Sequence, residues 1–207
     1  MQNFYDKIEK ECVSQFHAIQ SIQNDELEVE VRFGKYSKGG YHAGIKKEDF
    51  DKLLIVFMKS NAWSSKYTKQ STDYFDGNVR LNHSKNGYIC FEKIKLGSGE
   101  YVNPDNKMYD IRLSQSIEKP HDIPENVLTE LPNPDKYDHI RHKQRFTFVY
   151  SDIWLYEFTV CTVNSVHSYE LEIEMINPKM AVKKYNTKYL AESLVLMIKD
   201  IMNMINT

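Results

Sequence analysis

The sequence predicts an α+β protein in which antiparallel strands form a closed β-barrel with a polar, charged interior and helices packed on the outside. Three observations carry this prediction. Two strand-like segments, one toward each end of the chain, alternate glutamate with apolar residues. Segments between them alternate lysine and arginine in the same way, and three further segments have apolar residues at helical spacing. Period two is typical of strands and a period near 3.6 is typical of helices.

Composition narrows the class of protein. The chain has 207 residues, 41% of them hydrophobic and 13% aromatic, which is enough for one domain with its own core. The formal net charge is −2, so no overall positive field favours duplex DNA or an anionic membrane. The longest apolar run, Leu53 to Met58, is too short to span a bilayer. The start of the chain lacks a secretory signal, and Cys12, Cys90 and Cys161 are too few and too scattered for a disulfide framework, so we expect an intracellular, reducing location.

Three amphipathic helices are expected, within residues 1–24, near residues 47–60 and over residues 186–206. Apolar residues in each recur every three or four positions, as a helix with one buried face requires. The stripes are Phe4, Ile8, Cys12, Phe16 and Ile19; Phe50, Leu53, Leu54, Phe57 and Met58; and Leu190, Leu194, Met197, Ile198, Ile201 and Ile205. Asn186 and Thr187 are plausible caps for the third helix. These apolar faces can cover the outside of a barrel.

Residues 26–175, apart from the second helix, are interpreted as barrel strands. Asp76-Gly77, Asn86-Gly87 and Gly97-Ser98-Gly99 have turn chemistry and bracket runs rich in β-branched and aromatic residues. Antiparallel hairpins are therefore expected. The segment from Pro120 to Pro134 contains four prolines and several acids, and it is expected to be a loop. We see no domain boundary, so residues 1–207 are interpreted as a single domain.

The two acidic segments indicate a metal site. In a strand, Glu26, Glu28 and Glu30 share one face with Arg32, and Glu170, Glu172 and Glu174 share a face in the second segment. A half-solvated strand also alternates in this way. However, carboxylates about 7 Å apart repel by about 2 kcal/mol per pair at an effective dielectric near 20. A hard divalent cation relieves that repulsion, and glutamate oxygens suit Mg²⁺ or Mn²⁺ rather than zinc.

Cationic side chains follow the same period in the middle strands. Arg141, Lys143 and Arg145 share a face, as do Lys93 and Lys95, and Arg80 and Arg112 lie in further strand-like runs. Taken singly, each set is typical of a solvated basic face. Together with the acids they indicate an inward-facing polar lining that combines metal-binding carboxylates with cations. A polyphosphate is the ligand that needs both.

Three motifs resemble those of the triphosphate tunnel metalloenzymes. They are Glu28-x-Glu30-x-Arg32-Phe33-Gly34, the Arg-x-Lys-x-Arg strand at 141–145, and Glu170-x-Glu172-x-Glu174. Within that superfamily the chain resembles the metal-dependent RNA 5′-triphosphatases of fungal, protozoal and large DNA virus mRNA capping. The resemblance implies metal-dependent hydrolysis of the γ-phosphate of 5′-triphosphate RNA, the first step of cap formation, by in-line attack of water. It also implies Mg or Mn as cofactor, and hydrolysis of nucleoside triphosphates with Mn.

The resemblance implies a role for each motif residue. Glu28, Glu30 and Glu174 resemble the metal ligands. The catalytic set is Glu118, which orients the attacking water, with Glu170, Glu172 and Arg112. The phosphate-binding set is Arg80, Lys93, Lys95, Arg141, Lys143 and Arg145. The supporting set is Glu26, Arg32, Glu157 and Thr159. Glu157 stands where the family has an aspartate, and the choice between Lys93 and Lys95 stays open.

Two other functions fit parts of the pattern. Glu28-x-Glu30-x-Arg32 also approximates the Glu-x-Glu-x-Lys signature of tunnel enzymes that act on inorganic tripolyphosphate or thiamine triphosphate. A non-catalytic module that binds polyphosphate or RNA ends is the second alternative. The expected partners are a 5′-triphosphate RNA end and a guanylyltransferase domain or subunit, with no membrane and no duplex DNA. A lean toward Lys, Asn, Ile and Tyr hints at a viral protein in the host cytoplasm or virion; a fungal-type enzyme would be nuclear.

Overall fold

The structure is a computed structural model of the chain, and it describes all residues except 1, 23, 106–107, 126 and 128–131. Its described helices are α1 (Gln2–Ile19), α2 (Lys47–Lys59), α4 (Pro178–Lys184) and α5 (Thr187–Asn206), with a short 3₁₀ helix η1 (Pro134–Lys136). Of these, α1, α2 and α5 lie close to where the apolar stripes predict them, whereas α4 and η1 were not predicted. Asn186 caps α5, because its side chain accepts a hydrogen bond from the backbone N–H of Lys188.

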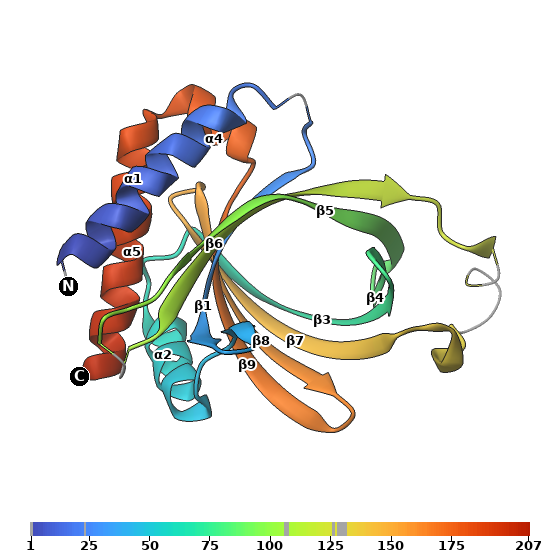
Figure 1. Ribbon diagram of the computed structural model, residues 1–207. Coiled ribbons are helices and arrows are strands. Elements are labelled where there is room, and N and C mark those ends of the chain that lie inside the picture. Colours follow the sequence, from blue (N-terminus) through green and yellow to red (C-terminus); the bar gives the residue numbers. More distant parts are fainter. Residues whose placement is uncertain (1, 23, 106–107, 126, 128–131) are drawn as a thin grey trace.

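The strands form a closed antiparallel barrel. They are β1 (Leu27–Ser37), β2 (Gly40–Ala43), β3 (Ser65–Asp76), β4 (Val79–Ser84), β5 (Gly87–Tyr101), β6 (Asp110–His121), β7 (His139–Tyr150), β8 (Trp154–Val163) and β9 (Val166–Met175). Their order is β2-β1-β6-β5-β4-β3-β7-β8-β9, and an additional β1–β9 pairing closes the sheet. All except β2 therefore belong to an eight-stranded barrel, and the predicted α+β fold class is confirmed (Figure 1).

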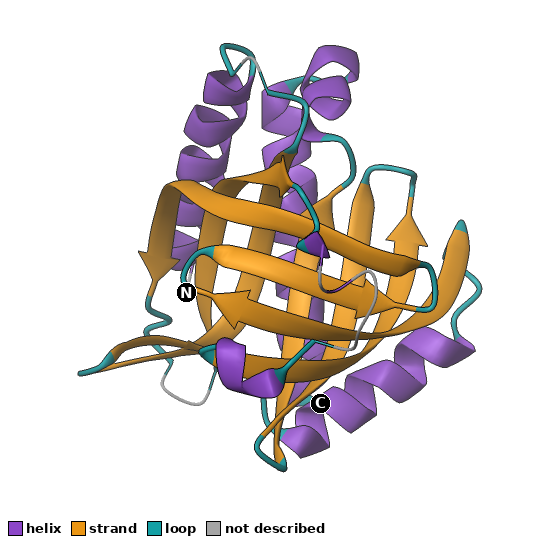
Figure 2. Cartoon of the chain, turned by 90° about the vertical axis from the view of Figure 1, so that its right-hand side faces the viewer, coloured by secondary structure: helices purple, strands orange, loops and turns teal. Residues whose placement is uncertain are grey.

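The main hydrophobic core lies between the barrel wall and the helices. Residues on the outward faces of β1 and β9, such as Val31 and Ile173, are buried together with Ile8 of α1 and Ile198 of α5. Figure 1 shows α1, α2 and α5 beside the wall that contains β1, β6 and β9, and Figure 2 shows the strands in front with the long helices behind. None of the described helices is long and apolar enough to cross a membrane.

Two of the three predicted turns are present and one is wrong. Gly77 (φ 56°) and Gly87 (φ 100°) provide the positive φ in the β3–β4 and β4–β5 turns. Gly97-Ser98-Gly99, in contrast, lies inside β5, where it pairs with Gln115, Ser114 and Leu113 of β6 after a register shift at Lys95. Local turn chemistry was overridden there by the neighbouring strand, and the glycines follow a β-bulge instead.

The proline-rich segment is only partly described. Pro120 lies within β6, opposite Phe91 of β5, and the segment ends at the start of η1. The prediction of a loop over residues 126 and 128–131 falls outside the described residues. Val127 is buried in a small second cluster with Leu81 and Cys90, so part of this segment covers the outer wall of β4 and β5.

Candidate active site

The two acidic strands meet where the barrel closes. In the β1–β9 pairing Glu30 lies opposite Glu174, and Arg32 lies opposite Glu172. Because these side chains share one face, the alternating apolar residues face the helices and the charged residues face the barrel interior. Leu27 and Val31 are 5% and 1% exposed on the outward face. Glutamates from opposite ends of the chain therefore converge inside a single barrel.

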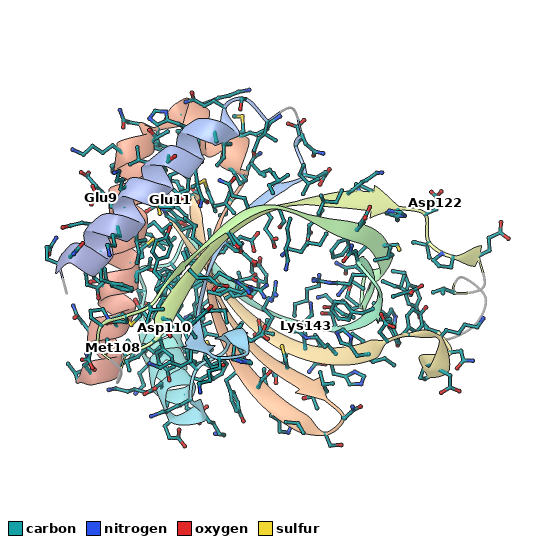
Figure 3. The ribbon with its side chains drawn as sticks, in the orientation of Figure 1. Glu9, Glu11, Met108, Asp110, Asp122 and Lys143 are labelled. Atoms are coloured by element: carbon teal, nitrogen blue, oxygen red, sulfur yellow. The ribbon has the colours of Figure 1, made fainter. Side chains whose placement is uncertain are left out.

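A first cavity of about 230 Å³, called cavity A here, lies inside the barrel. Residues from all eight barrel strands line it, which places it within the lumen. Its lining is Glu28, Arg32, Lys69, Ser71, Asp73, Arg80, Asn82, Ile89, Phe91, Lys93, Glu118, Lys143, Arg145, Leu155, Glu157, Glu172 and Glu174. Figure 3 labels Lys143 at the wall formed by β3 and β7, where its ammonium lies beside Asp73.

A second cavity of about 280 Å³, called cavity B, lies against β1, β4, β5 and β6. It is lined by Glu30, Arg32, Arg80, Lys93, Lys95, Gly97, Ser98, Glu100, Arg112, Ser114, Gln115 and Ser116. Arg32, Arg80 and Lys93 line both cavities. These three cations therefore stand between the two parts of the lumen.

Thirteen of the seventeen predicted site residues line these cavities. Cavity A takes Glu28, Arg32, Arg80, Lys93, Glu118, Lys143, Arg145, Glu157, Glu172 and Glu174, and cavity B adds Glu30, Lys95 and Arg112. Glu26, Thr159, Arg141 and Glu170 line neither. Lys93 contacts both Glu28 and Glu30, whereas Lys95 is exposed beside the bulge in β5.

Glu28 and Glu30 are held by hydroxyl groups and a shared lysine. Ser116 donates a hydrogen bond to Glu28 (2.8 Å) and Ser114 donates one to Glu30 (3.0 Å), each from the position directly opposite on β6. The Lys93 ammonium contacts both carboxylates. Burial alone would raise the pKa of Glu30, but the charges of Arg32 and Lys93 outweigh it and lower that pKa to about 2. Glu30 is therefore ionised at neutral pH.

Arg145 is fixed by three groups from β8 and β9. Its guanidinium lies 2.5 Å from Glu157 Oε2 and 3.7 Å from Glu172 Oε2, and its Nε donates to Thr159 Oγ1 at 3.1 Å. Glu157 is 4% exposed and Thr159 is fully buried. Glu157 and Thr159 thus hold the arginine in place, although Thr159 does not line the cavity. Glu157, which stands where the family has an aspartate, therefore contacts the guanidinium of Arg145.

Two further carboxylates of cavity A, those of Glu118 and Glu174, have no positively charged side chain within 4 Å among the described residues. Burial and then the neighbouring Glu157 and Glu28 raise the pKa of Glu174 well above its usual value. Burial and then Glu28 likewise raise the pKa of Glu118. Both shifts report carboxylates crowded together in a poorly solvated space. A cation placed among them would relieve the repulsion.

The donor set suits a hard divalent cation. Glu28, Glu30 and Glu174 offer only oxygen atoms, as Mg²⁺ and Mn²⁺ prefer. Among the described residues, no three acidic, histidine or cysteine side chains are already arranged as metal ligands, and the Lys93 ammonium contacts both Glu28 and Glu30. The residues fit such a cation by the chemistry of their donors and by the crowding of their charges.

Asp73 is a site residue that the sequence analysis missed. It is 1% exposed, lies 2.6 Å from the Lys143 ammonium and 3.9 Å from the Arg80 guanidinium, and accepts a hydrogen bond from Asn82. Burial opposes ionisation, yet Lys143 lowers the pKa of Asp73. Asp73 therefore positions two cations of cavity A. As one acid in a polar strand it gave no periodic signal.

Arg141 and Glu170 form a separate pair. They lie 2.9 Å apart, and Arg141 also donates to Cys161 Sγ at 2.8 Å. Arg141 lies near the start of β7 and Glu170 lies in the middle of β9, and their position relative to the cavities was not visible in the sequence. Glu26 precedes β1 and is exposed. Its backbone carbonyl accepts a hydrogen bond from the Glu118 N–H, and its own N–H donates to Asn24 Oδ1.

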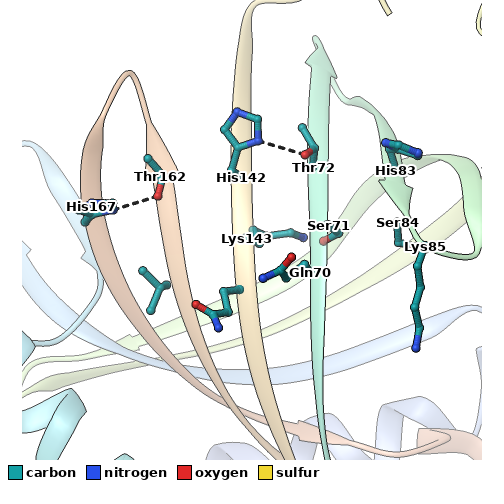
Figure 4. A pocket seen from close by; sticks show the side chains of 12 residues that line it. Gln70, Ser71, Thr72, His83, Ser84, Lys85, His142, Lys143, Thr162 and His167 are labelled. Atoms are coloured by element: carbon teal, nitrogen blue, oxygen red, sulfur yellow. Dashed lines mark hydrogen bonds between the residues drawn. The ribbon is translucent and has the colours of Figure 1, made fainter. Parts of the chain in front are cut away.

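A third hollow of about 460 Å³ lies across β3, β4, β7, β8 and β9 (Figure 4). His142 is hydrogen-bonded to Thr72 (3.0 Å) and His167 to Thr162 (2.9 Å). Lys143 lines this hollow as well as cavity A, but its ammonium is bound to Asp73. The hollow has no acidic lining residue among those described and adds no ligand to the carboxylate set.

Comparisons with known proteins agree with this geometry. A family model described as "mRNA capping enzyme, beta chain" matches residues 65–206, more than half of the chain. The fission yeast (S. pombe) Pct1 RNA triphosphatase has a similar fold, with a TM-score of 0.72 and 16% identity over 96% of this chain and 92% of that one. The Mimivirus capping enzyme triphosphatase is also similar, with a TM-score of 0.58 and 16% identity over 98% of each chain. No curated protein matches the sequence.

Proposed function

The chain belongs to the family of mRNA capping enzyme beta chains and is an RNA 5′-triphosphatase, and from this premise we propose how its barrel releases the γ-phosphate of a 5′-triphosphate RNA end. One observation carries the proposal. The β1–β9 pairing places glutamates from both ends of the chain in the same lumen as Arg80, Lys93, Lys143 and Arg145. This combination binds a polyphosphate and a divalent cation together.

We propose Glu28, Glu30 and Glu174 as the residues that hold the cation. Metal dependence is general for this fold, and the choice between Mg²⁺ and Mn²⁺ is part of the proposal because oxygen donors accept either ion. When bound, a divalent cation neutralises phosphate charge and lowers the pKa of a bound water. The raised pKa of Glu174 supports its assignment, since crowded carboxylates gain most from such a charge.

The cations of cavity A bind and orient the γ-phosphate. Arg145 is preorganised by Glu157 and Thr159, and Lys143 by Asp73, so neither must be ordered when the substrate arrives. Burial and the nearby Arg145 lower the pKa of Lys143, which reflects cations held close together. A phosphate placed among them offsets this repulsion. In the transition state the same groups stabilise the charge on the equatorial oxygens and the leaving oxygen.

Glu118 is the proposed base that orients the attacking water. It lines cavity A, lies opposite Lys93 in the β5–β6 pairing, and has no opposite charge within 4 Å among the described residues. Burial and Glu28 raise the pKa of Glu118, which makes it a better proton acceptor than an ordinary carboxylate. The water attacks in line with the bond to the β-phosphate, and orthophosphate and a 5′-diphosphate RNA end result.

The product defines the next partner. A 5′-diphosphate end is the acceptor for transfer of a guanylyl group, so we propose that a guanylyltransferase domain or subunit acts next. The fission yeast relative has been solved in complex with the Spt5 CTD.

The three cysteines are buried and free, which supports the proposed intracellular, reducing location, in a virus-infected cell or a nucleus.

The test is release of labelled orthophosphate from RNA carrying a γ-labelled 5′-triphosphate, with Mg²⁺, Mn²⁺ or no divalent ion. We expect divalent-dependent release and a 5′-diphosphate product. Inorganic tripolyphosphate and thiamine triphosphate are measured in parallel at equal enzyme. A kcat/KM higher for either small substrate than for RNA would assign the chain to the small-substrate branch. Tight RNA-end binding without hydrolysis under any metal condition would favour the binding module.

A further inference from the structure

A groove of about 450 Å³ lies on the outside of the molecule, away from the barrel interior. It is bordered by the end of α2, the β7–β8 turn and one face of α5. None of its lining residues lines cavity A or B. Strand β8 separates the two sites, because Leu155 and Glu157 face cavity A while Trp154 and Tyr156 face the groove.

The groove has a rigid aromatic floor. Trp154 and Tyr156 are 2% and 6% exposed, and the Trp63 ring stacks on Phe57 with centroids 4.7 Å apart. Both indole N–H groups are already satisfied within the chain. Trp63 donates to the Phe57 carbonyl at 2.7 Å, and Trp154 donates to Ser193 Oγ at 3.2 Å. The floor that these rings offer to a ligand is therefore apolar.

Large apolar side chains at the rim remain open to solvent. Tyr150 is 40% exposed, Tyr189 is 51% exposed and Leu196 is 59% exposed, and all three line the same groove. An exposed apolar surface that continues into a preformed aromatic pocket is typical of a protein-binding site. The volume also lies within the range of about 300–1,000 Å³ found for ligand pockets.

The charged side chains that line the groove are all negative among the described residues. Its charged lining residues are Glu192 and Asp200, both on α5, and no Lys or Arg of the described chain lines it. Glu192 has an exposed partner at 3.6 Å in Lys188, whereas Asp200 lies close enough to Tyr156 to contribute, after burial, to the raised pKa of that phenol. Such a rim repels nucleic acid and anionic lipid and attracts cations.

We propose that this groove binds a short segment of a partner protein in which one or two bulky apolar side chains are flanked by Lys or Arg. The apolar side chains would fill the floor between Trp63 and Trp154. The flanking cations would lie against Glu192 and Asp200. The complementarity of shape and charge identifies this occupant, and it does not depend on what the barrel interior hydrolyses.

The chain contains two tryptophans, and both line the groove, so intrinsic fluorescence reports its occupancy. The probes are three tryptophan-free peptides: acetyl-Lys-Lys-Phe-Ala-Ala-Leu-Lys-Lys-amide, its analogue with Glu in place of every Lys, and its analogue with Ser in place of Phe and Leu. We expect a saturable change with the first peptide. The other two should bind at least tenfold more weakly at low ionic strength.

Variants locate the binding. Leu196→Lys adds a positive charge at an exposed rim position and should weaken binding of the Lys-flanked peptide at least tenfold. The matched control is Val166→Lys in β9, 70% exposed and outside the groove, which should leave binding unchanged. Glu192→Gln combined with Asp200→Asn should weaken binding and reduce its salt dependence. RNA triphosphatase activity should remain in all variants, which verifies that they fold.

Four results would overturn the proposal. The first is equal binding of the Lys-flanked and Glu-flanked peptides. The second is the same response from the Leu196→Lys and Val166→Lys variants. The third is the absence of a saturable change with any of the peptides. The fourth is a concentration-dependent dimer in sedimentation velocity that Leu196→Lys dissociates, because the groove would then be covered by a second copy of this chain.

Discussion

Where β9 passes the site, its inward and outward faces are buried to a similar degree and behave in opposite ways. On β9, Glu172 is 3% exposed inside the barrel and its neighbour Ile173 is fully buried against the helices. The outward residue stabilises the fold by removing apolar surface from water. The inward carboxylate costs free energy to desolvate, and its ion pairs with Arg32 and Arg145 offset only part of that cost. Stability therefore comes from the outward face, and chemistry from the inward face.

The first way to test this comparison is to remove a side chain from the outward face. Phe158 is fully buried and its ring packs against Phe50, Phe57 and Phe148 at centroid distances of 5.6, 4.9 and 5.8 Å. Phe158→Ala should lower the free energy of unfolding by about 3–5 kcal/mol, measured by urea denaturation. Activity per folded molecule should be unchanged. The exposed control Ile55→Ala should have little effect; a large loss of activity in folded Phe158→Ala would contradict the division.

The inward face should respond in the opposite way. Glu28→Ala removes a proposed metal ligand and should reduce phosphate release about 10²–10³-fold, comparable to removal of one group that stabilises transition-state charge. The fold should be intact or more stable, since a repelling carboxylate is gone. Glu26→Ala is the matched control, because Glu26 is exposed and lines neither cavity. A Glu28 variant that unfolds, yet keeps metal-dependent hydrolysis per folded molecule, would contradict this prediction.

Asp73 tests the comparison between the two faces further, because it is an inward residue that forms ion pairs with Lys143 and Arg80. Asp73→Asn should destabilise the protein by about 1–3 kcal/mol near pH 7, since Lys143 and Arg80 lose their buried partner. The pKa of Asp73 is lowered on folding, so its stabilisation is present above the unfolded pKa of about 3.9 and is lost as pH falls through the folded value.

The measurement is urea denaturation of both proteins between pH 2 and 7. The difference in unfolding free energy should be constant above about pH 5 and shrink below about pH 4. The exposed Asp135→Asn serves as control. A difference that persists undiminished at pH 2 would show that Asp73 acts by shape rather than charge.

The smallest effect is expected at Glu174. It lies directly opposite Glu30 and near Glu28 and Glu157, so without metal Glu174→Gln should stabilise the protein by about 0.2–1 kcal/mol at pH 7. Divalent ions should raise the melting temperature of the wild type more than that of the variant, because only the wild type keeps three carboxylates. Calorimetric melting with and without Mg²⁺ measures both effects. Equal shifts in the two proteins would remove Glu174 from the ligand set.

The sequence predicted the features that repeat with a fixed period. Alternating acids and alternating cations identified the inward face of β1, β5, β7 and β9 because period two is a local property of a strand. The closed barrel followed, since two acidic strands from opposite ends need a shared interior. The three long helices were visible for the same reason, whereas the seven-residue α4 was too short to show a stripe.

Features that depend on pairing between strands were not predictable. Asp73 became part of the site through its neighbours Asn82 and Lys143 on β4 and β7. Gly97 and Gly99 extended β5 because β6 continues beside them. Arg141 and Glu170 pair with each other and line neither cavity. Register and position along a barrel axis are set by the whole sheet.

The short β1–β9 pairing has a consequence for how the protein is made. It joins Glu30, Val31 and Arg32 to Glu174, Ile173 and Glu172, residues more than a hundred positions apart in the chain. Contacts of such long sequence separation form late and slowly in folding. A nascent polypeptide therefore has no working centre until β9 has left the ribosome. Premature termination before that strand should give an inert product, never a partly active one.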